Sequence, residues 1–304
     1  MKILVTGSNG FIGGHVVRYL KEKGEYVIGL GRRNEPSQGE WLDEYVCCDM
    51  DTGEIERVFD KIKVDKLDAV VHLAADMRRE PYCVDVVSAN CVGTQRLLEF
   101  CEKHNIGVFA QLSSLPVIGH PVEHPITESH PLDPYTVYHI TKHTEEMLAN
   151  YAYKYRGVRT VSFRISAPVG IGVNPNTIFP TFIRKALEGK DLVLSGKGTR
   201  RQNYIHARDI AQALYKSIYN EKANGVYNLT GDLLISNIEL ANMIVKELKS
   251  NSKIVFSGID DEMDDYVWDA SLKRIKNDIG YEPVEKMEDA IVEYANWIKE
   301  EKSI

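Results

Sequence analysis

The sequence of 304 residues lacks any block of basic residues and any long apolar run. The net charge is −7 and the basic residues are scattered, so the chain offers no electrostatic footprint for nucleic acid or an anionic membrane. No apolar stretch reaches the length of a membrane span, and no charged segment precedes an apolar signal core. We therefore expect a cytoplasmic protein with no nucleic-acid or membrane partner.

Cysteine is scarce and follows no metal-binding pattern. The five cysteines are odd in number, and their spacing matches no metal-ligand motif. The nine histidines also lack such spacing, although His120, His124 and His130 fall in one loop and His139 and His143 on one predicted helix. We expect reduced structural thiols, histidines used for packing or in loops, and no metal site.

The chain does contain a regular alternation of apolar strands and amphipathic helices. Runs typical of strands buried on both faces lie near residues 2–6, 26–30, 45–48, 68–73, 107–112 and 158–164. Apolar residues recur at helical spacing in residues 11–20, 54–62, 84–104 and 137–155. With 43% hydrophobic residues and short connections, this pattern predicts a globular α/β protein with a Rossmann-type doubly wound parallel sheet.

The second half of the chain changes character. Short strands and helices mix there, and Ser236 and Glu239 have the spacing of a capping box before a helix. We therefore predict a dinucleotide-binding Rossmann domain over residues 1–165 and a smaller mixed α/β substrate-binding portion over residues 166–304. The segment of about residues 202–230 is a candidate for packing back onto the first domain.

Three glycines, Gly7, Gly10 and Gly13, stand between the first predicted strand and the first helix. A turn without side chains lets backbone N–H groups approach a pyrophosphate, and the start of a helix favours negative charge. The alternative is an ordinary glycine-containing loop. The position between strand and helix favours a dinucleotide site.

Tyr138 and Lys142 are four residues apart in the predicted helix 137–155, which places them on one face. A protonated lysine favours phenolate and lowers a tyrosine pKa from its usual value of about 10. Tyr138 is therefore a candidate general acid or base; the alternative is an amphipathic pair on a solvated surface. Ser114 supports catalysis, because it ends a predicted strand and ligands bind outside the carboxyl ends of such strands.

These motifs together resemble those of the extended short-chain dehydrogenase/reductase family, also called NAD(P)-dependent epimerases and dehydratases. The segments that carry the resemblance are TGSNGFIG (6–13), VHLAA (71–75), NCVGT (90–94), SSLPVIG (113–119) and YHITK (138–142). They are similar to the family patterns TGxxGFIG, HLAA, NVxGT, SSxxVYG and YxxxK. The resemblance spans nearly the whole chain.

The resemblance implies that hydride passes between a nicotinamide and a substrate carbon while Tyr138 exchanges the proton of the substrate hydroxyl. Ser114 would then bind the substrate oxygen, and Lys142 would also hold the nicotinamide ribose. It further implies a homodimer through helices 84–104 and 137–155. The predicted cofactor-binding residues are Gly7, Asn9, Gly10, Phe11, Ile12, Gly13, Arg32, Arg33, Asp49, Met50, Leu73, Ala74, Ala75, Asn90, Tyr138 and Lys142.

The end of the second strand bears on the choice of cofactor. An acidic residue there would bind the adenosine ribose hydroxyls, but this chain has Gly31 followed by Arg32 and Arg33. The two arginines could pair with a 2′-phosphate. We therefore predict NADP(H); if both arginines are simply solvated, NAD(H) is the alternative.

The chain departs from the family pattern at three places. Dehydratases have an Asp-Glu pair after the catalytic Ser or Thr, but here Ser114 is followed by Leu-Pro, which disfavours dehydration. Gln202 stands where a family arginine contacts the nucleotide, so Arg200 or Arg201 is a candidate replacement. Ser166 stands where an asparagine often contacts the substrate.

We predict an NADP-dependent enzyme that acts on a hydroxyl or keto carbon of a nucleotide sugar, as a 4-epimerase or a 4-keto-reductase. One alternative is an NADPH-dependent ketone reductase of a non-nucleotide substrate. Another is a non-catalytic regulator that senses a dinucleotide. Ser114, Tyr138 and Lys142 argue against the regulator, because a sensor needs no acid or base.

Overall fold

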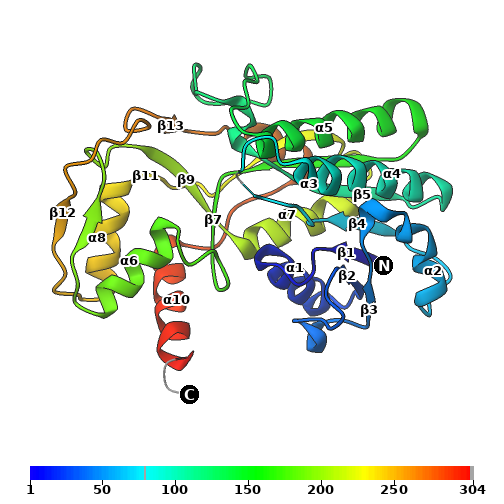
Figure 1. Cartoon of the computed structure of the whole chain (residues 1–304), viewed down its shortest axis with the longest axis horizontal. Helices are drawn as coiled ribbons and strands as arrows, with labels where there is room; N and C mark the ends of the chain where they lie inside the picture. The colour runs from blue at the N-terminus through cyan, green and yellow to red at the C-terminus, as the bar shows by residue number, and fades with distance from the viewer. Residues whose placement is uncertain (79, 302–304) are drawn as a thin grey trace.

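The structure, a computed structural model, describes residues 1–78 and 80–301 (Figure 1). Seven parallel strands form the central sheet in the order β10-β6-β5-β4-β1-β2-β3. They are β1 (Lys2–Thr6), β2 (Tyr26–Gly31), β3 (Glu44–Cys47), β4 (Ala69–His72), β5 (Val108–Ser114), β6 (Thr160–Ile165) and β10 (Gly225–Leu229). The strand order reverses between β1 and β4, where ligands bind in such sheets. The predicted doubly wound parallel sheet is confirmed.

The central sheet separates two hydrophobic cores, and β1 shows why its sequence is apolar throughout. Ile3 and Val5 pack into the core on one face, and Leu4 packs into the core on the other. Helices α1 (Phe11–Glu22), α7 (Ala207–Tyr219) and α9 (Lys273–Ile279) contribute to the first core. Helices α2 (Val58–Lys61), α4 (Gly93–Lys103) and α5 (Val137–Arg156) contribute to the second.

Two predicted helices differ from their expected form. Residues 84–104 are not one regular helix: a π-helical segment, η4 (Ser88–Val92), lies between α3 (Val84–Val87) and α4. This wider turn contains Asn90, whose side chain bonds to the loop after β4. Residues 54–62 form a 3-10 turn followed by the short α2. The 3-10 turns are η1 (Gly39–Trp41), η2 (Met50–Thr52), η3 (Glu54–Arg57) and η5 (Leu115–Ile118).

The remaining elements surround a third core. In a small sheet, β9 (Arg201–His206) pairs in parallel with β7 (Ala167–Val169) and β13 (Val267–Trp268), and antiparallel with β11 (Leu234–Ser236). A separate parallel pair consists of β8 (Leu192–Leu194) and β12 (Ile254–Phe256). Helices α6 (Ile178–Leu187), α8 (Asn237–Glu247) and α10 (Met287–Glu301) pack around this core. The predicted capping box of Ser236 and Glu239 begins α8.

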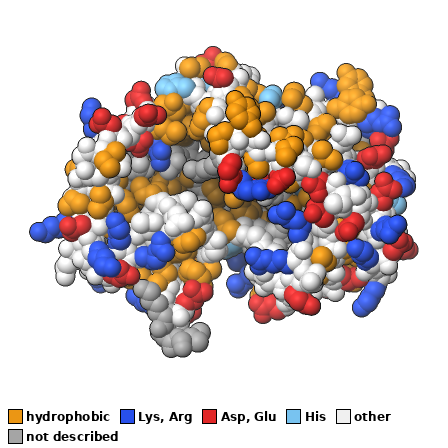
Figure 2. All heavy atoms as spheres, viewed as in Figure 1, with side chains coloured by type: hydrophobic (Ala, Val, Ile, Leu, Met, Phe, Trp, Pro, Cys, Tyr) orange, Lys and Arg blue, Asp and Glu red, His pale blue; other side chains and the backbone are white. Residues whose placement is uncertain are grey.

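The chain crosses more than once between the central sheet with its helices and the elements around the third core. Strand β10 comes late in the sequence but lies at one edge of the central sheet, and α7 packs against α1. Figure 2 shows a hollow between the part that holds α6 and α8 and the part that holds α3 and α5. A ligand held at the carboxyl ends of the central strands would reach this region.

Candidate active site

The glycine turn after β1 has no room for side chains. Gly7 has a φ of +69°, and a Cβ atom there would lie 2.7 Å from the backbone nitrogen of Ala74. A Cβ atom on Gly13 would lie 2.1 Å from the carbonyl oxygen of Gly7. Both contacts are far shorter than van der Waals distance, so only glycine lets the turn, α1 and the end of β4 approach this closely.

The start of α1 is suited to an anion. Its N-cap residue, Gly10, makes no side-chain hydrogen bond to the helix. The first N–H groups of a helix have no partner within it, and Phe11 and Ile12 supply two of them here. The turn therefore fits the pyrophosphate of a dinucleotide, with the helix dipole favouring its negative charge.

The end of β4 is fixed beside the glycine turn by Thr6. The backbone N–H groups of Leu73 and Ala74 both donate to Thr6 Oγ1 at 3.2 Å. Thr6 Oγ1 also lies 2.7 Å from His72 Nδ1, and His72 Nε2 lies 3.0 Å from Thr94 Oγ1. These contacts hold residues 73–75, predicted to border the cofactor, against the turn.

Tyr45 closes the position at the end of β2 where an acidic side chain would stand. A Cβ atom on Gly31 would lie 2.9 Å from the Tyr45 hydroxyl oxygen. That hydroxyl donates to the carbonyl oxygen of Arg33 at 2.8 Å, and Asn9 Nδ2 donates to it at 2.9 Å. Any larger residue at Gly31 would have to displace Tyr45.

Asn9, a predicted cofactor ligand, also holds the loop that follows β2. Its Oδ1 accepts the backbone N–H of Ser37 at 2.8 Å. Arg33 Nη1 in turn donates to the Ser37 hydroxyl at 3.1 Å. The loop therefore presents a guanidinium and a hydroxyl side by side. The sequence analysis identified neither Tyr45 nor Ser37. Both bond to Asn9, which is distant from them in the sequence.

Arg32 lies among carboxylates. Its charge favours ionisation of Asp49, Asp51 and Asp76, but it is not the largest influence on the pKa of any of them. Burial is the largest influence on Asp49 and raises its pKa, whereas the hydrogen bond with Asp49 is the largest influence on Asp51 and lowers its pKa. Met50, a predicted cofactor-binding residue, is buried in the core that contains Leu4.

Ser114 lies at the carboxyl end of the central sheet, and Tyr138 and Lys142 lie on the helix that packs against its strand. Ser114 is the last residue of β5, and the turn η5 follows directly. Helix α5 begins after Thr136, whose hydroxyl accepts the backbone N–H of His139, and α5 packs against both β5 and η5. Lys142 is buried, with its side chain 5% exposed. The alternative of a solvated surface pair is therefore wrong.

The ionisation of Tyr138 differs from the expectation. Burial raises its pKa, and the opposing effect of the Lys142 charge does not overcome burial. Burial is also the largest influence on Lys142 and lowers its pKa, but Glu145, together with Tyr138 and Glu146, outweighs burial, so the lysine pKa is raised. Lys142 Nζ lies 2.6 Å from Glu145 Oε2. The prediction that Lys142 brings the tyrosine pKa down is thus wrong for the net shift in the unliganded chain.

A second buried carboxylate, Glu146, has a different partner. Arg164 donates to it through Nε at 2.9 Å and Nη2 at 2.8 Å. Burial alone would raise its pKa, but the hydrogen bonds from Arg164, with His143 Nδ1 nearby at 3.6 Å, hold that pKa at about 2. The pair joins α5 to β6. Neither Glu145 nor Glu146 was identified by sequence reasoning, although the i,i+3 spacing of Lys142 and Glu145 was visible.

Asn90, another predicted cofactor residue, joins the loop after β4 to α5. Its Oδ1 accepts the backbone N–H of Asp76 at 2.7 Å, and its Nδ2 donates to the Asp76 carbonyl and to Thr141 Oγ1, both at 2.9 Å. These contacts give Asn90 a structural role, because they join the loop that contains Asp76 to α5. Its role toward the cofactor stays a prediction.

The predicted substrate residues have unequal surroundings. Ser166 is buried, and its hydroxyl has no hydrogen-bond partner within residues 1–78 and 80–301. Arg201 is held by the Leu234 carbonyl at 3.0 Å and the Glu239 carboxylate at 3.3 Å. Arg200 keeps a buried Nε without a partner among the same residues. Arg200 is therefore the better candidate for a replaced nucleotide contact.

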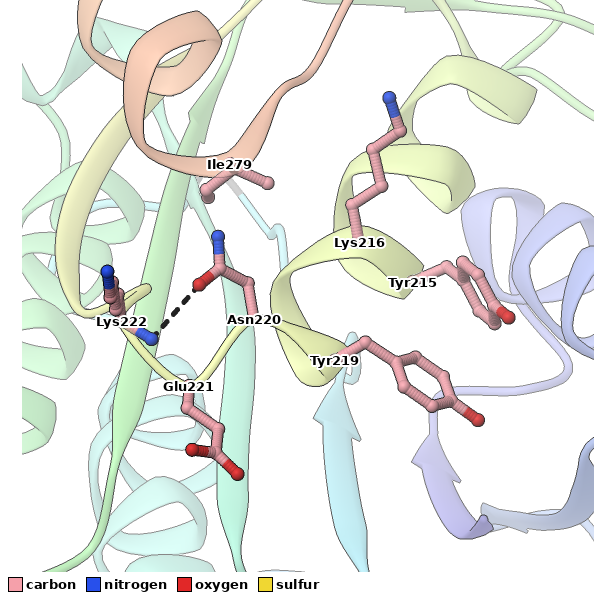
Figure 3. Close-up of a pocket in the computed structure, with 7 residues that line it drawn as sticks. All are labelled: Tyr215, Lys216, Tyr219, Asn220, Glu221, Lys222 and Ile279. Carbon is pink, nitrogen blue, oxygen red and sulfur yellow. Dashed lines mark hydrogen bonds between the residues drawn. The ribbon is translucent and has the colours of Figure 1, made fainter.

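One cavity, of about 770 Å³, lies away from these residues (Figure 3). It is bordered by the end of α7, the loop that leads into β10, and Ile279 of α9. In Figure 3, the side chains of Tyr215 and Tyr219 project from α7 on one side. The cavity precedes β10, at the amino end of a parallel strand, whereas Ser114 stands at a carboxyl end. It therefore has no part in this site.

In the described part of the chain, no three His, Cys, Asp or Glu side chains are grouped so that they could hold a metal ion. The same residues include no helix that is both long and apolar enough to cross a membrane.

A sequence model of the NAD dependent epimerase/dehydratase family matches residues 3–230. The chain belongs to this family. The resemblance to extended short-chain dehydrogenases/reductases is thereby confirmed, and the protein is an NAD(P)-dependent enzyme of that type. A dTDP-glucose 4,6-dehydratase of Streptomyces niveus is 27% identical over 318 residues, covering 100% of this chain and 94% of the relative.

Solved structures of family members share the fold over the whole chain. UDP-glucose 4-epimerase of Thermotoga maritima, solved with UDP-glucose, superimposes with a TM-score of 0.88 at 23% identity, covering 99% of this chain and 100% of that one. dTDP-glucose 4,6-dehydratase of Bacillus anthracis, solved with NAD, has a TM-score of 0.84 at 24% identity, covering 100% and 98%. The relatives thus include both epimerases and dehydratases.

Proposed function

We propose that this family member is an NADP(H)-dependent enzyme that oxidises or reduces a hydroxyl-bearing or keto carbon of a nucleotide sugar, as a 4-epimerase or a 4-keto-reductase. The observation that carries the proposal is the position of Ser114 at the end of β5, beside the start of α5 with Tyr138 and the buried Lys142. The similar dTDP-glucose 4,6-dehydratase and UDP-glucose 4-epimerase support the substrate class.

Each residue has a role that its position allows. Ser114 donates a hydrogen bond to the substrate oxygen and so orients the reacting carbon. Tyr138 gives or takes the hydroxyl proton as general acid or base. Lys142 holds the nicotinamide ribose and favours the phenolate form of Tyr138. The nicotinamide supplies or accepts the hydride when it is bound.

Dehydration is disfavoured by the residues that follow Ser114. Leu115 is buried in a small core with Val117, Ile118 and Trp268, so this turn presents packing side chains rather than carboxylates. Elimination of water needs a further acid and base beside the sugar. We therefore propose redox chemistry at one carbon without loss of water.

NADP(H) is the proposed cofactor. Tyr45 closes the position at Gly31 where an acidic residue would bind the ribose hydroxyls, which disfavours NAD(H). Arg33 and Ser37 together offer a guanidinium and a hydroxyl, a donor pair that suits a 2′-phosphate. The charge of Arg32 is partly offset by the carboxylates around it, so we assign the larger contribution to Arg33.

We also propose a homodimer, with residues 166–304 as the substrate-binding portion. Apolar side chains are exposed on α3, η4 and α5, and Figure 2 shows such side chains over α5. They are Val84, Val87, Val92, Ile140, Met147, Tyr151 and Tyr155. Exposed apolar side chains on helices of this kind suit a partner subunit. The cytoplasm is the proposed location, in keeping with five free cysteines.

The function is tested by incubating the protein with a panel of nucleotide sugars and 4-keto sugars. NADPH absorbance and the stereochemistry of the products are followed together. An epimerase inverts one carbon without net consumption of NADPH, and a reductase consumes one NADPH for each product. Failure of every nucleotide sugar, combined with reduction of simple ketones, would contradict the nucleotide-sugar assignment.

A ketone reductase of a non-nucleotide substrate is the second candidate. It is favoured by Gln202, which stands at the position of the family's nucleotide-contacting arginine and donates to the Tyr204 hydroxyl at 2.8 Å. Arg201 is held by Glu239, which leaves Arg200 as the neighbouring arginine that could contact a diphosphate. A purely regulatory protein would bind NADPH but convert none of the nucleotide sugars, 4-keto sugars or simple ketones.

A further inference from the structure

A buried carboxylate lies against the lysine of the site, and the mechanism above gives it no role. Glu145 is one turn beyond Lys142 on α5, and its Oε2 lies 2.6 Å from Lys142 Nζ. The two side chains are 1% and 5% exposed. An ion pair this deeply buried is unlike the surface pairs of the chain, because water stabilises neither charge.

Neither member of this pair is suited to carry its charge alone. Burial lowers the pKa of Lys142 and raises the pKa of Glu145, so each of these effects favours the neutral form. Glu145 Oε1 has no hydrogen-bond partner within the described residues. The Lys142 ammonium is therefore the main group that compensates for burial of this carboxylate.

The other titratable groups around Lys142 do not replace Glu145. His72 of β4 is neutral, because burial and the Lys142 charge lower its pKa to about 3. Burial raises the pKa of Cys91 in η4, which keeps it a thiol, and burial likewise raises the pKa of Tyr138. Glu146 is ionised, but its carboxylate is bound on both oxygens by Arg164.

We propose that Glu145 is the counter-ion that holds Lys142 in the site as a cation, and so acts on Tyr138 as a positioning residue through Lys142. An ammonium group has three N–H donors, and the contact with Glu145 uses one. Two donors remain for the nicotinamide ribose. This inference rests on the proposed function only for the roles of Lys142 and Tyr138 in turnover.

The test measures the ionisation of Lys142 directly, without substrate or cofactor. The full chain is labelled with ¹³C at the lysine Cε, and the Lys142 resonance is assigned by its absence from Lys142→Met. In the unsubstituted protein Lys142 stays charged well above neutral pH. In Glu145→Gln its titration midpoint falls by about two pH units or more, because a buried lysine has lost its counter-ion.

Glu146→Gln is the matched control, since it removes the neighbouring buried carboxylate, whose partner is Arg164. The midpoint of Lys142 should move far less in this variant. An unchanged midpoint in folded Glu145→Gln, or an equal shift in both variants, would overturn the proposal. The conservative variant Glu145→Asp keeps a carboxylate, so its Lys142 midpoint should lie close to that of the unsubstituted protein.

A second variant covers the case in which Glu145→Gln does not fold. Removing one member of a buried ion pair leaves an uncompensated charge, whereas removing both does not. The double variant Lys142→Met with Glu145→Gln should then regain the circular dichroism spectrum of the folded chain. If it also fails to fold, Glu145 acts through packing and the proposal is wrong. Absence of turnover on every substrate would contradict the proposed function but leave this titration unaffected.

Discussion

The cofactor side and the substrate side of the site differ in how closely their backbone and side chains are packed. Around Gly7, Gly13 and Gly31, backbone and side chains approach so closely that a single added Cβ atom would collide. On the substrate side, Ser166 Oγ and Arg200 Nε are buried without a partner in the described part of the chain. The comparison suggests that the cofactor side is formed in the free protein, whereas the substrate side is completed by its ligand.

The largest effect is expected from Tyr138→Phe, which keeps both sides of the site but removes the proton-transferring hydroxyl. Turnover should fall by about a hundredfold to ten-thousandfold, the usual range for a lost general acid or base. Binding of NADPH, measured by fluorescence titration, should change little. Unaltered turnover in every active assay would remove Tyr138 from the mechanism.

Gly13→Ala should break the cofactor side. The new Cβ atom would lie 2.1 Å from the Gly7 carbonyl oxygen, so the turn must open, and we expect the Kd for NADPH to rise by at least about tenfold. Gly14→Ala is the matched control in the same helix, because its Cβ atom meets only the flexible Gln38 side chain. Equal Kd values for the two variants would show that the turn does not bind the dinucleotide.

Arg33→Ala should separate the two cofactors. Loss of a charged hydrogen bond to a 2′-phosphate should raise the Kd for NADPH by about ten- to a hundredfold and leave the Kd for NADH nearly unchanged. Arg32→Ala should have a smaller effect, since nearby carboxylates partly offset the charge of that guanidinium. Equal effects on NADPH and NADH would end the assignment of NADP(H).

The smallest effect is expected on the substrate side. Arg200→Ala should raise KM for the active nucleotide sugar by about fivefold, the cost of about one ordinary hydrogen bond, with kcat little changed. Arg201→Ala is the comparison, since Arg201 is held by Glu239 and should affect stability more than KM. The reverse order would show that Arg201 provides the nucleotide contact.

The difference between the two sides also explains what the sequence could predict. The run Ile3-Leu4-Val5 and the glycines after it are local signals, so the buried strand, the turn and the parallel sheet were predictable. Tyr138 and Lys142 were identified by their spacing and by the resemblance to the family. These features depend on neighbours in the sequence.

Contacts between distant residues were not predictable in this way. Tyr45 reaches Gly31 and Asn9 because β3 lies beside β2, and no local pattern indicates that contact. The ion pair of Lys142 and Glu145 is local, but its importance comes from burial, because α5 packs against β5 and β6. Burial also reverses the expected net shift in the pKa of Tyr138.

The central claim, that the cofactor side is complete before substrate arrives and is built for NADP(H), is tested most directly by fluorescence titration of the unsubstituted protein with NADPH and with NADH, in the absence of any sugar. We predict saturable binding of both, with a Kd for NADPH at least about tenfold lower. Binding that requires an added nucleotide sugar, or a lower Kd for NADH, would contradict the account.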